Sequence, residues 1–219
     1  MEPLQYGNLF LLNHGDLEEG NGVISTIVCG AARPSDLDEV CVAAHLYDTN
    51  KAETLQKVRN VFERLKAEEL EVLGEDWIES WHEGLPNCLT LDDPYQFGQM
   101  VWMHNIIKAF GMLDYSKDRY GTFDGNIKKW DFEKRPRDNI QKMVTMWGYM
   151  PGIAFEPDKD YTDYLRNVPE KNKGKVLEAL RFTHNLCSSS GDKSSIEIPE
   201  EWETAYDMRP WTEFPMQKK

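Results

Sequence analysis

The part of the chain best suited to bind a ligand lies between Gly30 and Glu39. It follows the β-branched run 23–29 and has the sequence Gly-Ala-Ala-Arg-Pro-Ser-Asp-Leu-Asp-Glu. This order is typical of a buried strand, a tight turn and the capped start of a helix. Such junctions bind phosphate groups in α/β proteins, because the first N–H groups of the helix and its dipole point toward the ligand. The residues that we expect to contribute are Gly30, Arg33, Ser35, Asp36 and Glu39.

Arg33 is the strongest single candidate in this segment. Its guanidinium group has the geometry to pair with a phosphate through two hydrogen bonds. The alternative is that Arg33 pairs with Asp36 or Glu39 and only stabilises the start of the helix. The nearby carboxylates favour this alternative, because they neutralise the arginine and repel a polyanion.

The four cysteines, Cys29, Cys41, Cys88 and Cys187, are far apart in the sequence. Structural zinc sites and iron–sulfur clusters need thiolates at short spacing, so we expect neither, and we assign no metal ligand. Scattered single cysteines are typical of a reducing compartment, and we expect a cytoplasmic protein. A hydrolase or metalloenzyme stays open as a hypothesis only if His82, Glu83 and His104 converge in the fold.

The chain is acidic, with a formal net charge of -13 at pH 7 and an isoelectric point near 4.9. Such a surface repels phosphate backbones, so nucleic acid is not an expected partner. No apolar run approaches the roughly 20 residues that span a bilayer. The first residues also lack the basic and apolar regions of a secretory signal. We therefore expect a soluble protein without membrane insertion.

Helical periodicity dominates the chain after residue 30. The clearest apolar stripes predict helices near 52–73, 94–110 and 169–187. Shorter helices are expected at 4–12, from Ser35, at 114–120 and at 139–147. The helix from Ser35 has the expected inner stripe Leu37, Val40, Cys41 and Ala44, and the tail has the expected anchors Trp202, Tyr206, Trp211 and Phe214. We expect a mainly α fold with a small N-terminal strand–turn–helix unit.

The order of features over residues 5–44 resembles the end of the aldo/keto reductase barrel. Residues 5–14 are similar to the helix before the eighth strand, 23–31 to that strand, and 33–39 to the helix start that holds the adenosine phosphate of NADP. A weaker likeness to the long members of that family, which have a helical ferredoxin-like extension, covers the sets 84–88, 105–111 and 114–120. The resemblance implies a barrel-end segment at 1–50, a helical domain at 51–187, and a loop with an aromatic strap at 188–219.

The sequence departs from this family at several positions. The catalytic Asp, Tyr, Lys and His of the family belong to earlier strands, and no residue here can be assigned to that tetrad. Asp36 replaces the usual amide, Val40 replaces a frequent asparagine, and Cys88 stands alone where a cluster needs four thiolates. The resemblance thus implies an NADP-linked oxidoreductase fragment, or a subunit completed by a partner, with the cluster ligands lost.

The alternative function is a non-catalytic helical protein that binds another protein or belongs to a larger complex. The chain has seven tryptophans, a residue enriched at the energetic centres of interfaces. A single strand is not stable by itself in water, because its backbone needs a neighbouring strand. Residues 23–29 therefore either pair with another polypeptide or do not form a strand.

Overall fold

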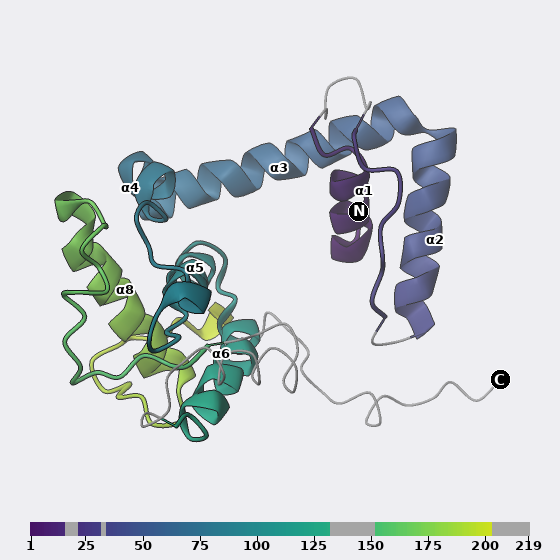
Figure 1. Ribbon diagram of the computed structural model, residues 1–219. Helices are drawn as coiled ribbons and strands as arrows, with labels where there is room; N and C mark the ends of the chain where they lie inside the picture. Colours follow the sequence, from purple (N-terminus) through teal and green to yellow (C-terminus); the bar gives the residue numbers. More distant parts are fainter. Residues whose placement is uncertain (16–21, 32–33, 132–151, 203–219) are drawn as a thin grey trace. The chain divides into compact units, whose positions relative to one another are not determined.

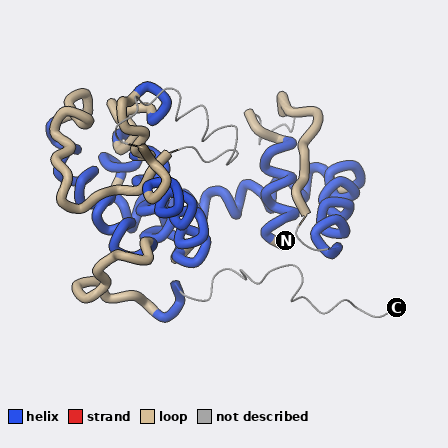
Figure 2. Tube along the Cα trace, turned by 60° about the horizontal axis from the view of Figure 1, so that its bottom comes forward, coloured by secondary structure: helices blue, strands red, loops and turns tan. Residues whose placement is uncertain are grey.

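The computed structural model describes residues 1–15, 22–31, 34–131 and 152–202. These residues form α-helices, two short 3-10 helices at Cys88–Thr90 and Glu200–Trp202, and no β-strand. The α-helices are α1 (Pro3–Leu12), α2 (Pro34–Thr49), α3 (Lys51–Leu73), α4 (Glu75–Ser80), α5 (Phe97–Phe110), α6 (Leu113–Ile127) and α8 (Glu170–Cys187), shown in Figure 1 and Figure 2. The mainly α class predicted from periodicity is confirmed.

The three longest predicted helices are present as α3, α5 and α8. α3 and α8 begin within one residue of the predicted positions, and α6 continues past residue 120 to Ile127. α5 begins at Phe97, later than the predicted Asp93-Pro94 start. The backbone of residues 94–96 instead pairs with Ile153, whose N–H donates to the Pro94 carbonyl at 2.9 Å, and the Asp93 carboxylate binds Lys159 and Tyr164. The helix predicted at 139–147 and the tail beyond Trp202 lie outside the described residues.

The chain divides into two compact units, residues 1–67 and 68–208, and the division falls inside α3. The sequence instead places boundaries after residues 50 and 187. In the first unit α1 packs against α2. Its small core contains Leu9, Ala43 and Val58, with Tyr6, Phe10 and Tyr47 packed around it.

The second unit has the larger core. α8 packs against both α5 and α6, and the loop after residue 152 covers them with aromatic side chains. Large side chains that are fully buried there include Tyr95, Phe97, Met100, Met103, Ile107, Tyr120 and Phe123. A parallel bridge between Tyr95 and Ile153 joins the segment before α5 to this loop. The second unit therefore has a well-packed frame that can hold a pocket in shape.

The strand predicted at 23–29 is not present in the structure. Residues 24–31 are extended but form no strand, and within the described chain no other strand lies beside them. The β-branched composition favours an extended backbone, but a strand also needs a neighbour that accepts and donates its hydrogen bonds. The strand–turn–helix unit is thus present only as an extended segment followed by α2.

Candidate functional site

The extended segment 22–31 lies between α1 and α2 (Figures 1 and 2). Two contacts fix it to the end and side of α1: the Val23 N–H donates to the His14 carbonyl at 3.3 Å, and the Cys29 Sγ donates to the Asn8 Oδ1 at 3.2 Å. Its other side faces solvent, with Val23 82% and Val28 100% exposed. One side of this segment is therefore held by helices, and the other has apolar side chains without cover in the described part of the chain.

α2 also leaves apolar side chains in solvent. The stripe predicted to face inward is largely outward, because Leu37 is 54% exposed and Cys41 and Ala44 are exposed as well. The residue that packs against Leu9 and Val58 is Ala43 instead. The stripe is real as a pattern, but within the described residues no element covers it.

The residues predicted to bind a phosphate lie around the start of α2. Gly30 and Ser35 are exposed, and Ser35 is the second residue of the helix rather than its cap. Asp36 is half-buried. Glu39 is half-buried too, and it accepts a hydrogen bond from the Gln5 Nε2 at 2.5 Å. Arg33 lies outside the described residues.

These described residues do not fit the adenosine phosphate of NADP. α2 contains Asp36, Asp38 and Glu39 near its start and no lysine or arginine at all. Carboxylates at a helix N-terminus compete with a bound anion for the same N–H groups and the same dipole. Glu39, one of the residues expected to contribute to cofactor binding, already has Gln5 as a partner.

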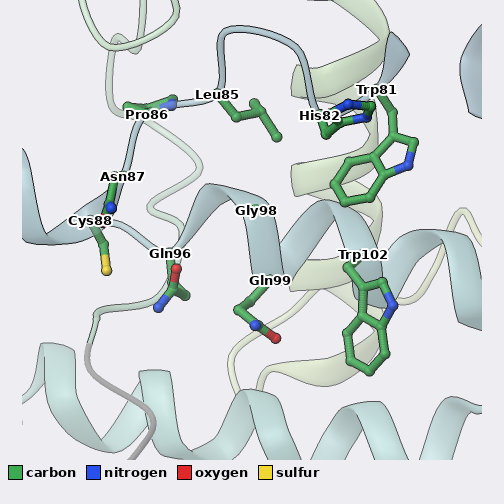
Figure 3. A pocket seen from close by; sticks show the side chains of 10 residues that line it. All are labelled: Trp81, His82, Leu85, Pro86, Asn87, Cys88, Gln96, Gly98, Gln99 and Trp102. Carbon is green, nitrogen blue, oxygen red and sulfur yellow. The ribbon is translucent and has the colours of Figure 1, made fainter. Parts of the chain in front are cut away.

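The second unit contains a pocket of about 470 Å³ that no sequence motif indicated. Figure 3 shows its lining: Trp81, His82, Leu85, Pro86, Asn87, Cys88, Gln96, Gly98, Gln99 and Trp102. These residues come from the end of α4, the loop that follows it and the first half of α5. The local sequence gave one signal, the dense placement of tryptophans around residue 81, but spacing alone did not indicate which of them share a cavity.

A second hollow of about 780 Å³ lies beside α6 and α8. His184 lines it and is only 5% exposed. The Tyr120 hydroxyl accepts from the Phe155 N–H at 3.1 Å and is hydrogen-bonded to the His184 Nδ1 at 3.0 Å. Burial lowers the pKa of His184 and outweighs the opposing effect of Asp124, so the ring is a neutral hydrogen-bond donor.

The carboxylate of Asp124 completes the polar lining of this hollow. It accepts hydrogen bonds from the Ser188 hydroxyl at 2.8 Å and from the Ser189 N–H at 3.1 Å. Asp124 is more than 60 residues from Ser188 and Ser189 in the sequence, so no local motif predicts these hydrogen bonds. The arrangement fixes the end of α8 to α6 and needs no ligand to satisfy it.

The triad of His82, Glu83 and His104 does not form a metal centre. His104 lies on α5, where its Nδ1 is 2.9 Å from the Asn105 Oδ1 and its ring contacts Phe182 edge-on. Burial lowers the pKa of His104. Over the described ranges there is no group of three or more His, Cys, Asp or Glu side chains placed to hold a metal ion, and all four cysteines are free thiols.

In the described chain, no helix combines the length and apolar character needed to cross a membrane. Comparison of the chain with protein-family models, curated proteins and solved structures finds no match. The resemblance to the aldo/keto reductase barrel therefore stays a prediction from the residues at 5–44.

Proposed function

We propose that this chain is an aldo/keto reductase-related protein whose N-terminal unit completes a barrel supplied by another part of the same protein or by a partner. The chain takes no part in the reaction by residues of its own. Its segment 23–29 adds as a strand to an open barrel edge, and α2 then covers that strand and its neighbour. The oxidoreductase chemistry belongs to the polypeptide that carries the catalytic tetrad.

The observation that carries this proposal is the uncovered side of segment 22–31. A β-branched segment that has helices on one side and solvent on the other resembles a strand of an α/β protein whose neighbouring strands are missing. Val28 is fully exposed, and Val23 and Leu37 are exposed near it in the sequence. A group of exposed apolar side chains is typical of a surface that another element covers. The exposed stripe of α2, with Leu37 and Cys41, supports the same conclusion, because such a stripe belongs against a sheet.

The resemblance at residues 5–44 supports the identity of the missing layer. It places 5–14, 23–31 and 33–39 at the last helix–strand–helix step of a barrel, and that step needs a first and a seventh strand beside it. The order helix, extended segment, helix supports this assignment. The alternative, a helical interaction protein that uses the same exposed residues against an unrelated partner, predicts no preference for a barrel.

The proposal assigns NADP to the completed assembly. The described start of α2 has three carboxylates and no cation, so the phosphate would depend on Arg33 and on groups of the partner. We therefore expect the cofactor to bind the completed assembly and not the isolated chain. Isothermal titration of the isolated chain with NADPH tests this, and saturable binding would contradict it.

The experiment for the proposal is a complementation assay. An aldo/keto reductase truncated before its eighth strand is mixed with this chain, and complex formation is measured by size-exclusion chromatography with light scattering. We expect a one-to-one complex with the wild-type chain. Val28→Lys should prevent it, because the lysine replaces an apolar side chain that the partner must cover.

The matched control is Leu65→Lys on α3. Leu65, like Val28, is an exposed apolar side chain of the first unit, but it lies on α3, outside segment 22–31 and outside α2. This variant should bind as the wild type does. Absence of any complex with the wild-type chain, or equal binding by Val28→Lys, would refute the proposal.

A further inference from the structure

The pocket lined by Trp81 and Trp102 differs in charge from the rest of the molecule. None of its ten lining residues is an aspartate, glutamate, lysine or arginine. In the whole chain 29% of the residues are charged, and the net charge is -13. Apart from the imidazole of His82, the lining has no basic or carboxylate group that could pair with a charged ligand, so the ligand chemistry that it fits best is neutral.

Two indole rings form one wall of the pocket. Trp81 follows α4, and Trp102 projects from α5, and Figure 3 shows both rings on the same side of the cavity. Trp102 is 36% exposed, although tryptophan is usually well covered. Its ring is held by an edge-on contact with Tyr115 at 6.2 Å between centroids. A fixed and exposed indole face is a surface on which a ligand can stack.

One amide side chain lies next to this wall, and two others lie on the opposite side of the pocket (Figure 3). Gln99 is exposed on α5, and Figure 3 shows it beside Trp102, while Gln96 and Asn87 lie on the side of Cys88. The Asn87 Oδ1 accepts from the Leu89 N–H at 2.9 Å, so this side chain is oriented by the chain itself. Gln96 and the Asn87 Oδ1 already have partners within the chain, so Gln99 is the amide that the argument uses, with one acceptor and one donor group. A ligand group that matches both is a hydroxyl, which also donates and accepts.

We propose that this pocket binds a neutral saccharide. A pyranose has a face of C–H groups, whose partial positive charge matches the negative face of an indole, and an edge of hydroxyls that matches amides. The volume of about 470 Å³ is that of a small-molecule site, with room for one to three sugar rings along an open groove. The proposal uses residues of the second unit only and is independent of the barrel-completing function of segment 22–31.

The test is a titration of the full chain with cellotriose and maltotriose, followed by tryptophan fluorescence and by isothermal calorimetry. Indole is the comparison ligand, because it stacks on tryptophan but has no hydroxyls. We expect saturable binding of at least one trisaccharide with a Kd below about 10 mM. We expect Trp102→Ala to weaken it by about tenfold or more, and Gln99→Ala to weaken it by a smaller factor.

The control variant is Gln56→Ala, which removes an exposed glutamine from α3 and should leave saccharide binding unchanged. Far-UV circular dichroism confirms that each variant is folded, and Trp102→Phe should retain part of the affinity because a phenyl ring still stacks. Three outcomes would overturn the proposal: no saturable binding of either trisaccharide, equal binding by Trp102→Ala, or binding of indole with no binding of a saccharide.

Discussion

Gly111 ends α5 with φ 64°, a left-handed conformation that residues with a Cβ adopt at a cost of about 1–2 kcal/mol. A Cβ at this position would also lie 2.8 Å from the Trp202 Cδ1. The Trp202 ring in turn lies 6.0 Å from the Lys108 ammonium, which is closer, at 4.5 Å, to the Phe182 ring. Gly111 thus links the end of α5 to the last described turn of the chain.

We expect Gly111→Ala to lower the free energy of unfolding by more than about 1 kcal/mol, because it adds strain and displaces Trp202. The control is Gly121→Ala within α6, where a Cβ meets no atom within 4 Å. That variant should be neutral or stabilise the protein by up to about 1 kcal/mol, since alanine favours a helix. Urea unfolding measures both, and an unchanged midpoint for Gly111→Ala would show that the contact is unimportant.

The environment of Asp93 makes the stability of the fold depend on pH. Burial raises the pKa of this carboxyl, but hydrogen bonds from Tyr164 and Lys159 and the lysine charge outweigh burial and lower the pKa below its ordinary value. A lowered pKa in the folded state gives stability that is fully present above the ordinary value near 3.9 and is lost as the pH falls through the lowered one.

We therefore expect Asp93→Asn to be less stable than the wild type near pH 7 and to approach it in stability below about pH 4. Tyr164→Phe removes one of the hydrogen-bond donors to this carboxylate and should show a smaller difference. Thermal unfolding from pH 7 to pH 3 measures this. A difference between wild type and Asp93→Asn that is constant over this range would contradict the assignment.

Tyr120 is the buried hydroxyl that connects Phe155 with His184. Tyr120→Phe leaves a buried N–H and a ring nitrogen without their partner, so we expect a loss of about 1–3 kcal/mol in the free energy of unfolding. Tyr47→Phe in the first unit, where the ring is half-buried, should change stability by less than about 0.5 kcal/mol. Equal effects of the two variants would indicate that the Tyr120 hydrogen bonds contribute little.

At the scale of elements, apolar periodicity predicted α3, α5 and α8 because each packs one stripe and exposes the other side. Propensity was not sufficient for segment 23–29, because it predicts an extended backbone but not the neighbouring strand that would pair with it. α2 shows a related limit, because the inner stripe predicted from Leu37 is wrong and Ala43 is the residue inside. The two cavities were not predictable, since Trp81 with Trp102, and Tyr120 with His184, meet only in the folded chain.

The two sides of α2 give a direct test at this scale. Leu37→Glu places a charge in solvent, so it should change the free energy of unfolding by less than about 0.5 kcal/mol. Ala43→Glu places a charge against Leu9 and Val58, so it should cost several kcal/mol and unfold the first unit. Circular dichroism during heating distinguishes them. A large loss for Leu37→Glu would mean that the exposed stripe is covered within the chain.

At the scale of the whole molecule, the chain combines an N-terminal unit that has a small core with a second unit that has a larger one. The first unit has a small core and bare apolar side chains, among them Val23 and Val28. The second has fully buried aromatic residues and includes the pockets beside Trp81 and beside His184. This asymmetry agrees with a protein that uses its N-terminal unit to join a larger body and its second unit to hold a pocket.

Hydrogen exchange of the backbone amides of residues 24–31 tests this account most directly. The measurement is made on the chain alone and on the chain mixed with the barrel truncated before its eighth strand. We predict exchange near the rate of an unstructured peptide in the isolated chain, and protection of alternate or successive amides in the complex, because strand pairing supplies their acceptors. Slow exchange in the isolated monomer, or unchanged fast exchange after mixing, would contradict the proposal that this segment is a strand awaiting its neighbour.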